Sequence, residues 1–409
     1  MKKSFFMGLL AMCLSPLSLL AKDLKVFVTN TQNVQRQEVV ALDVAKVRSE
    51  LGLTDGDSFV VLNASGQQVD WQVTYDSLLI FDASVRPKSK ATFKIVAGKP
   101  MPMKQWVKGS FRPDRADDMV WENDRAAYRA YGPALEQSGE KAYGFDVWTK
   151  NTPELVVDER YTLNATGDKV KRQLAKEGKK EQADSAGIYT SFHYDHGNGL
   201  DAYGVGATLG CGTPALMVDG EMVMPYCFRE YRILDNGPLR FTVELTYNPT
   251  QVGADGNVVE HRVISLDKGS NFNKITIWYD GLTKSLDLAS GVVIHKEDTE
   301  SVVLGKNFVA YADPTDNVDG NCCQLYVATL YPNGLVSTTQ KPMLKPESGA
   351  TGHALGIKKG LSDGEKYTYY FGSAWSKYDV RTFPEWQLRI QEFLDALRFP
   401  LSISMETKE

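Results

Sequence analysis

Residues 239–246 read LRFTVELT, and every second residue in this stretch is apolar. The leucine, phenylalanine and valine side chains would share one face of a strand, and the arginine, threonine and glutamate side chains the other. This period of two predicts a β-strand with one buried face. The pattern returns in residues 258–266, 272–279 and 290–295, with glycine-containing turns nearby. Strands at such short spacing predict a large antiparallel sandwich rather than alternating β/α units.

The chain divides into two expected β-rich units, so the predicted fold class is mainly β. In residues 24–100, apolar residues such as Leu24 and Val26 alternate with polar ones, and turn residues separate further short apolar runs. We expect this segment to form a small β-sandwich. After a proline-containing linker at residues 101–104, we expect residues 105–405 to form the larger sandwich and to carry the functional site.

Helical periodicity is scarce, and its clearest case lies near the C-terminus. The apolar residues at helical spacing are Trp386, Ile390, Phe393, Leu394 and Leu397, with Pro384 suited to the first turn and Pro400 to the end. Residues 164–186 are polar and lysine-rich, which favours a solvated loop or a short surface helix, with a lid over a binding site as the alternative. Residues 187–193 alternate again and predict a short strand that ends at His193.

Composition and cysteine content exclude several classes of function. The 409 residues are 43% hydrophobic and carry a formal charge of −5, which is typical of a folded chain and argues against nucleic acid as a partner. The chain has no CxxC spacing, so neither a zinc site nor thioredoxin-like chemistry is expected. Cys211 and Cys227 could close a disulfide, and buried thiols are the alternative.

The N-terminus predicts export. Lys2 and Lys3 precede an uncharged apolar run, which ends near Ala21. A basic start, a short apolar run and a small residue predict a secretory signal peptide over residues 1–21. We therefore expect a periplasmic or extracellular protein. Because no later stretch is long and apolar enough to span a bilayer, we expect no membrane insertion after cleavage.

The densest group of ionisable side chains is HYDHGNGLDAY, which starts at His193. Imidazole titrates near neutral pH, so His193 and His196 are candidates for a general base or acid. Tyr203 could return a proton to a leaving oxygen. A metal site of His193, Asp195 and His196 and a purely structural or binding loop are the alternatives. We expect no metal, and His295, at the end of another strand, could face the same cleft.

A second group, WENDRAAYRAYG, starts at Trp121. Aromatic rings stack on the C–H faces of sugars, carboxylates accept hydroxyl protons, and arginine pairs with a carboxylate. This combination predicts a site for a sugar acid. The alternative is an internal ion pair of Arg125 with Glu122 or Asp124.

These motifs, together with ILDNGPLRFTVEL and FGSAWSKYD, resemble the exported bacterial domain-of-unknown-function 4861 family, whose members occur in polysaccharide-utilisation clusters. The resemblance covers about residues 24–405. It implies a β-supersandwich related to galactose mutarotases and many polysaccharide lyases, and a role in glycan metabolism. The positions that match the motifs are Trp121, Glu122, Asp124, Arg125, Tyr131, His193, His196, Asp201, Tyr203, Trp375 and Lys377.

The leading hypothesis is an enzyme that acts on uronate-containing oligosaccharides by β-elimination or a related dehydration. Such a reaction needs a neutralised carboxylate, a base and an acid. Arg125 would neutralise the carboxylate, His193 or His196 would abstract the proton, and Tyr203 would protonate the leaving oxygen. The other matched positions would bind the substrate.

Three alternatives remain open at this point. Glycoside hydrolysis needs two opposed carboxylates, which Glu122, Asp124 and Asp201 could supply. Mutarotase-like epimerisation would pair a histidine with a carboxylate. A non-catalytic glycan-binding protein would use the same aromatic residues without proton transfer. In every case the expected partner is an oligosaccharide, and no cofactor is expected.

Overall fold

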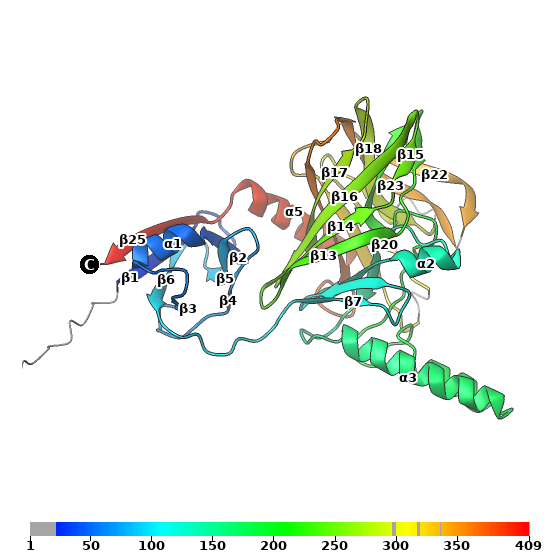
Figure 1. Cartoon of the computed structure of the whole chain (residues 1–409), viewed down its shortest axis with the longest axis horizontal. Coiled ribbons are helices and arrows are strands. Elements are labelled where there is room, and N and C mark those ends of the chain that lie inside the picture. The colour runs from blue at the N-terminus through cyan, green and yellow to red at the C-terminus, as the bar shows by residue number, and fades with distance from the viewer. Residues whose placement is uncertain (1–21, 297–299, 317–319, 336, 348, 409) are drawn as a thin grey trace, which may run out of the picture.

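The computed structural model describes residues 22–296, 300–316, 320–335, 337–347 and 349–408. The expected signal peptide, residues 1–21, lies outside the described residues. Within them, two β-rich bodies are joined by residues 98–107, which form neither helix nor strand (Figure 1). None of the described helices is both long and apolar enough to cross a membrane.

The N-terminal body, at the left of Figure 1, is a small sandwich of antiparallel sheets. Its elements are β1 (Asp23–Asn30), β2 (Arg36–Asp43), α1 (Val44–Leu51), β3 (Phe59–Leu62), β4 (Trp71–Val73), β5 (Leu78–Val85), β6 (Ser89–Ala97) and β25 (Ser402–Lys408). The strand orders are β25–β1–β6–β3 and β2–β5–β4. Val26 of β1 lies opposite Met405 of β25, so the C-terminal strand joins the N-terminal body. The domain limit predicted at residue 405 therefore falls inside β25.

The larger body is built on a pair of antiparallel sheets. Its strands are β11 (Cys211–Val218), β12 (Glu221–Val223), β13 (Phe228–Asn236), β14 (Arg240–Tyr247), β15 (Thr250–Val252), β16 (Asp255–Asp267), β17 (Phe272–Asp280), β18 (Leu286–Ile294), β19 (Val302–Leu304), β20 (Phe308–Asp313), β21 (Leu325–Leu330), β22 (Ser337–Glu347), β23 (Ala350–Leu361) and β24 (Tyr367–Trp375). One sheet runs β13–β14–β16–β17–β24–β21–β20–β19, with β15 beside β16, and the other runs β12–β11–β18–β23–β22. In β14, Phe241, Val243 and Leu245 are fully buried, as their alternation predicts. The mainly β fold class is confirmed.

A further sheet lies between the larger body and a helical layer. Its strands are β7 (Lys108–Arg112), β8 (Asp118–Glu122), β9 (Ala126–Ala130) and β10 (Asp146–Thr149), in the order β10–β9–β8–β7. The helices in this part of the chain are α2 (Pro133–Ser138), α3 (Val157–Lys176) and α4 (Lys180–Thr190). Trp121 stacks on Phe241 of the larger body, and Trp148 stacks on Tyr161 of α3. Gly109 allows the close approach, because a Cβ there would lie 2.2 Å from the Phe241 ring.

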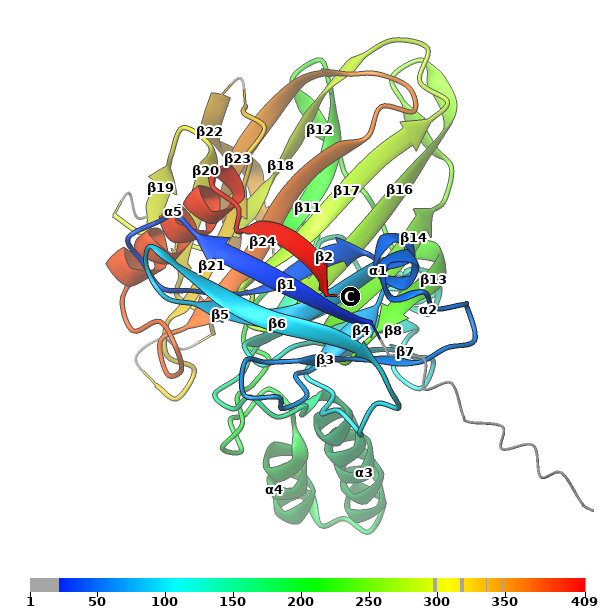
Figure 2. The ribbon, with the colours of Figure 1, turned by 90° about the vertical axis from the view of Figure 1, so that its left-hand side faces the viewer.

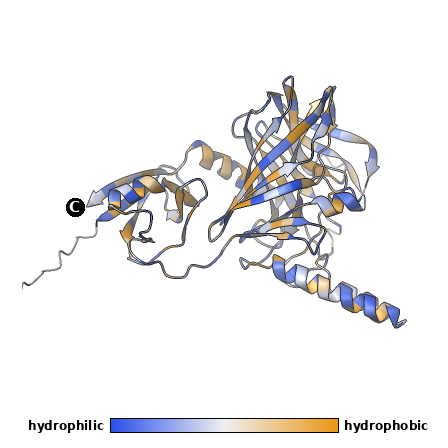
Figure 3. Cartoon of the chain, viewed as in Figure 1, coloured by the Kyte–Doolittle hydropathy of each residue, from blue (hydrophilic) through white to orange (hydrophobic). Residues whose placement is uncertain are grey.

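Helices α3 and α4 form a polar hairpin that projects from the larger body (Figures 2 and 3). The helices touch at Gly167, where an added Cβ would lie 1.5 Å from Thr190 Oγ1. The strand predicted for residues 187–193 is wrong, because α4 continues to Thr190. Ile188 and Tyr189 are 51% and 76% exposed, so the alternation in this segment does not mark a buried face.

The predicted C-terminal helix is confirmed as α5 (Phe383–Arg398). Thr382 caps its N-terminus, where the hydroxyl accepts a hydrogen bond from a first-turn amide. Trp386 and Ile390 are fully buried against the larger sheet, and the Trp386 ring stacks on Phe272. The helix thus packs on the sheet through the apolar face that its spacing predicts.

Cys211 and Cys227 both carry free, buried thiols, so the disulfide alternative does not apply to them. Burial raises the pKa of the Cys227 thiol to about 12 and that of Cys211 still further above its usual range. Thiols held protonated in this way are poor nucleophiles. Both side chains pack in the protein core.

Candidate functional site

Two aromatic residues expected to bind substrate lie in the core. Trp121 is 1% exposed, and its Nε1 donates a hydrogen bond to Asn273 Oδ1 at 2.7 Å. Trp375 is 2% exposed and donates to the backbone oxygen of Cys322 at 2.7 Å. Because both rings are enclosed and both indole N–H groups are satisfied, neither side chain can stack on a glycan.

Glu122 is a buried structural carboxylate rather than a substrate ligand. It accepts hydrogen bonds from Lys150 Nζ at 2.6 Å and from the backbone N–H groups of Val156 and Val157 at 2.8–3.0 Å. The two amides belong to the start of α3, where a carboxylate satisfies unpaired donors and complements the helix dipole. Glu122 therefore joins β8 to the helix.

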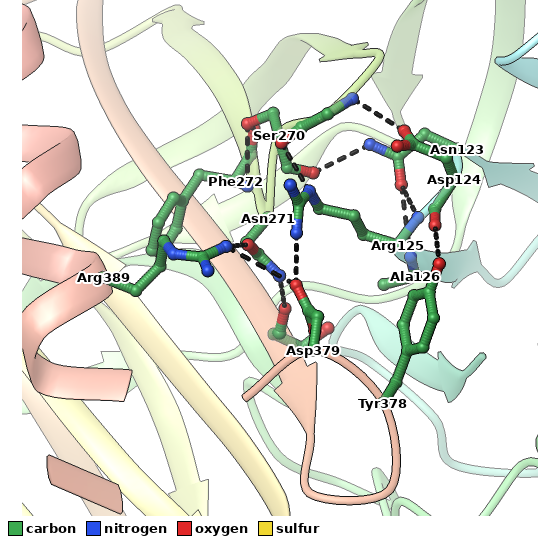
Figure 4. A network of polar contacts seen from close by, with 12 residues as sticks. Asn123, Asp124, Arg125, Ala126, Ser270, Asn271, Phe272, Tyr378, Asp379 and Arg389 are labelled. Atoms are coloured by element: carbon green, nitrogen blue, oxygen red, sulfur yellow. Dashed lines mark hydrogen bonds and ion pairs between the residues drawn. The ribbon is translucent and has the colours of Figure 1, made fainter. Parts of the chain in front are cut away.

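Arg125 and Asp124 belong to a network beside α5 (Figure 4). The Arg125 guanidinium pairs with Asp379 and donates from Nε to the backbone oxygen of Gly269 at 2.5 Å. Asp124 accepts from the Gly269 amide at 2.6 Å. Within the described residues, no hydrogen bond or ion pair links Arg125 to His193. The cation expected to act beside the histidines thus has other partners.

One guanidinium and three carboxylates form a buried cluster at β8–β10. Arg129 Nη2 lies 2.5 Å from Asp146 Oδ2 and 3.1 Å from Asp201 Oδ2, and Nη1 lies 3.7 Å from Asp118 Oδ2. Nη2 also donates to the Tyr131 hydroxyl at 3.3 Å. All four charged side chains are at most 8% exposed. Two predicted residues, Asp201 and Tyr131, thus meet three that the sequence did not reveal.

Three buried carboxylates that face one guanidinium retain a proton near neutral pH. Burial raises the pKa of Asp146 to about 8 against the opposing charge of Arg129, and Asp201 adds to the rise. The unfolded chain releases this proton near pH 4, so the unfolding free energy should fall between about pH 5 and 8 by up to about 1.4 kcal/mol per pH unit. In Asp146→Asn this component should be absent. Chemical denaturation of both proteins across that range measures it, and equal slopes would contradict it.

His193 stands at the edge of this cluster, with its side chain 53% exposed. Its Nδ1 lies 3.1 Å from the backbone oxygen of Asp201 and 3.7 Å from the carboxylate Oδ2 of the same residue. A carbonyl oxygen only accepts hydrogen bonds, so Nδ1 carries the hydrogen and Nε2 of the neutral ring carries the lone pair. Within the described residues Nε2 has no hydrogen-bond partner. His193 can therefore act as a base toward a bound molecule.

The rest of the histidine loop is held by its own polar contacts. His196 Nε2 lies 2.8 Å from the backbone oxygen of Ser191 and donates to it. Asp195 accepts from two loop amides and pairs with Lys377, and these contacts lower its pKa although desolvation opposes them. The loop contacts therefore occupy His196, Asp195 and Lys377. Across the part of the chain that the structure describes, no group of three or more His, Cys, Asp or Glu side chains is arranged so that it could hold a metal ion.

A second histidine–carboxylate pair lies at the ends of β18 and β20. His295 Nδ1 lies 2.6 Å from Asp313 Oδ2, and the ring stands edge-on to Tyr203 at 5.7 Å. Burial opposes protonation of His295, but the hydrogen bond and charge of Asp313 outweigh it and raise the imidazole pKa. Among the described atoms, His295 Nε2 and the Tyr203 hydroxyl are buried without a hydrogen-bond partner. Tyr203 therefore lies behind the accessible part of the site.

Asp316, exposed in the loop after β20, connects the two pairs electrostatically. Desolvation and the carboxylates of Asp201 and Asp313 raise its pKa, while His193 and His295 act in the opposite direction. All four groups act on the Asp316 carboxyl, so both pairs lie within electrostatic range of it. An accessible acid of raised pKa within electrostatic range of an accessible imidazole can donate and accept protons at a bound molecule.

Comparison with known proteins assigns this chain to a family. The family described as "Domain of unknown function (DUF4861)" matches residues 28–403. The chain belongs to the DUF4861 family. The match covers both β-rich bodies, and it confirms the resemblance that the sequence motifs indicated.

Other proteins are similar to this DUF4861 chain over most of its length. "Uncharacterized protein P7" of Formosa agariphila is 27% identical over 372 residues, which cover 87% of this chain and 85% of that protein. A glycosyl hydrolase family 38 protein from Enterococcus faecalis superimposes with a TM-score of 0.47 and 9% identity, over 95% of this chain and 47% of its own. An α-mannosidase from Enterococcus faecalis V583 gives 0.43 and 10%, over 95% and 46%. The DUF4861 chain spans about half the length of these solved structures.

The residues that sequence reasoning missed lie on separate strands of the DUF4861 fold. Asp146 lies opposite Arg129 in the register of β10 and β9, a proximity that follows from strand pairing rather than from sequence spacing. One signal was available, because Arg129 interrupts the apolar run of β9, and a charge in a buried strand needs a partner. The position of His295 at a strand end had indicated that it could face the same cleft as His193.

Proposed function

We propose that this chain is an exported carbohydrate-active enzyme that acts on uronate-containing oligosaccharides by proton abstraction, as a lyase or dehydratase. Membership of DUF4861 supports the carbohydrate part, because the motifs resemble a family found in polysaccharide-utilisation clusters. One observation carries the chemistry. The side chain of His193 is 53% exposed, and the hydrogen bond from its Nδ1 to the Asp201 carbonyl leaves Nε2 without a partner among the described residues, within electrostatic range of Asp316.

In this reaction His193 and Asp316 divide the proton transfers. His193 Nε2 accepts the proton from the carbon next to the uronate carboxylate, and the electron pair of the broken C–H bond forms a carbon–carbon double bond. The neighbouring carbon–oxygen bond breaks, and Asp316 donates its proton to the departing oxygen. This assignment replaces Tyr203 and Arg125, because the Tyr203 hydroxyl is buried and Arg125 is paired with Asp379.

His193→Ala is expected to lower kcat/KM on an acidic oligosaccharide by about a hundredfold or more, because a positioned base contributes at least this factor. The increase in ultraviolet absorbance of the unsaturated uronate product measures the rate. His261→Ala is the matched control. His261 stacks on Trp278 and pairs with Asp280 outside the site, so its loss should leave turnover near that of the parent.

Equal rates in His193→Ala and the parent would exclude His193 as the base. New reducing ends without a rise in absorbance would indicate hydrolysis instead of elimination. Binding without any product would indicate a glycan-binding protein. A folded His193→Ala variant, with the melting temperature of the parent, is required for each comparison.

A further inference from the structure

A cleft of about 560 Å³ opens between the N-terminal body, the large sheet and α5. Residues 34–39 border it on one side, strands β16 and β17 supply the base, and α5 closes the other side. This volume is within the range of small-molecule sites, which is about 300–1,000 Å³. None of the residues around His193 lines this cleft, so it is a separate feature of the molecule.

Among the charged side chains of the cleft lining, the three acidic ones, Glu38, Asp267 and Glu392, are outnumbered by six positive ones. The positive side chains are Arg36, Arg125, Arg240, Lys268, Lys274 and Arg389. Three of these cations have their charge matched by a nearby carboxylate. Arg36 pairs with Glu38, Arg240 forms a two-point contact with Asp267 at 2.6 and 2.7 Å, and Lys268 pairs with Asp82 at 2.6 Å.

The other three cations keep donors that nothing in the described residues uses. Lys274 Nζ makes no hydrogen bond or ion pair there, Arg125 Nη2 and Arg389 Nη2 make no hydrogen bond, and all three side chains are at least 26% exposed. Arg125 and Arg389 converge on a single carboxylate, Asp379, and Arg389 also donates to Asn271 Oδ1 at 2.7 Å (Figure 4). Arg389 Nε also lies 3.8 Å from Glu392 Oε2, so Arg125 and Arg389 together face two carboxylates, and Lys274 is the cation of the cleft without a carboxylate partner among the described residues.

An aromatic surface lies beside these cations. Tyr370 lies opposite Lys274 in the register of β24 and β17, and it is only partly buried. Its ring packs edge-on against Phe393 of α5 at 5.1 Å, and Phe393 lies 4.6 Å from Phe272. The unused guanidinium and ammonium donors can bind the anionic groups of a ligand, and the neighbouring aromatic ring can pack against the C–H face of a sugar ring. Together they fit an acidic sugar.

We propose that this cleft is a second binding site, which holds an acidic oligosaccharide by its carboxylates. The site is separate from the reaction assigned to His193 and requires no chemistry of its own. Arg125 and Arg389 bind carboxylate oxygens with the free edges of their guanidinium groups. Lys274 adds a third charge, and Tyr370 packs against a sugar ring. The glycan is thereby held between the N-terminal body and the sheet.

Binding of trigalacturonate to the His193→Ala protein, measured by isothermal titration calorimetry, tests the proposal without turnover. Adding Lys274→Gln and Arg389→Gln should weaken binding at least tenfold, roughly 1.4 kcal/mol. The matched control carries Lys169→Gln and Arg172→Gln, the same change of charge on the exposed surface of α3, and should bind within twofold of the parent. Trigalacturonate with methyl-esterified carboxylates should bind at least tenfold more weakly than the free acid.

The proposal is overturned if the cleft variant binds as tightly as the control, if the methyl ester binds as tightly as the acid, or if the parent does not bind trigalacturonate. An unchanged melting temperature shows that the cleft variant is folded. The difference in binding between the cleft variant and its matched control reports on the cleft, and the turnover of His193→Ala reports on the proposed reaction.

Discussion

Arg129→Met is expected to lower the unfolding free energy at neutral pH by about 3–5 kcal/mol, the usual cost of removing one partner from a buried ion pair. The guanidinium lies within 3.7 Å of Asp118, Asp146 and Asp201, and methionine would leave these carboxylates without a cation. Because protonation relieves their repulsion, the loss should shrink as the pH falls toward about 4. Chemical denaturation at pH 7 and pH 5 measures both effects.

Arg232→Met is the matched control for this experiment. Arg232 also lies on a strand and pairs with Glu244 at 2.6 Å, but its side chain is 71% exposed. An exposed ion pair contributes at most about 1 kcal/mol, so the control should unfold almost like the parent. Similar losses in the two variants would mean that water screens the Arg129 cluster, contrary to its burial.

Glu122→Ala is expected to cost a similar amount, about 3–5 kcal/mol. The substitution leaves the ammonium group of Lys150, which is fully buried, without its carboxylate, and the amides of Val156 and Val157 without an acceptor. Burial already lowers the pKa of Lys150, and removal of Glu122 lowers it further. The penalty should therefore decrease at alkaline pH, where Lys150 loses its proton. Denaturation curves of both proteins at pH 7 and pH 10 test whether the loss of stability is smaller at the higher pH.

A double variant separates charge from packing in this pair. Glu122→Leu with Lys150→Met replaces both charges with apolar groups, a change that is often close to neutral in other buried pairs. It should recover most of the stability lost in Glu122→Ala. Amide hydrogen exchange at Val156 and Val157 should nevertheless remain fast in the double variant, because their acceptor is missing. Slow exchange there would show that another group caps α3.

Local hydrophobic periodicity predicts much of the fold. The alternation of residues 239–246 predicts β14 because one face of that strand is buried, and the spacing of Trp386 and Ile390 predicts α5 for the same reason. The alternation of residues 187–193 misleads, since that segment is a largely exposed helix end. Periodicity reports burial, and it loses its meaning where nothing is buried.

The candidate site was only partly visible in the sequence. His193 and Asp201 lie in one short loop, so their proximity is local and could be predicted. Arg129 and Asp146 become neighbours only through the pairing of β9 with β10. The spacing of residues along the sequence does not reveal which strands pair. Trp121 looked suited to a sugar because a buried tryptophan and a binding tryptophan are the same letter in the sequence.

The pairing of β25 with β1 has a consequence for biosynthesis. A ribosome makes β1 early, but the edge of β1 that pairs with Met405 has no partner until residues 402–408 emerge. Throughout translation this edge exposes unpaired N–H and C=O groups, which can pair with other chains. The N-terminal body therefore lacks one edge strand throughout translation, and we expect a chain truncated before residue 402 to aggregate more readily than the full chain.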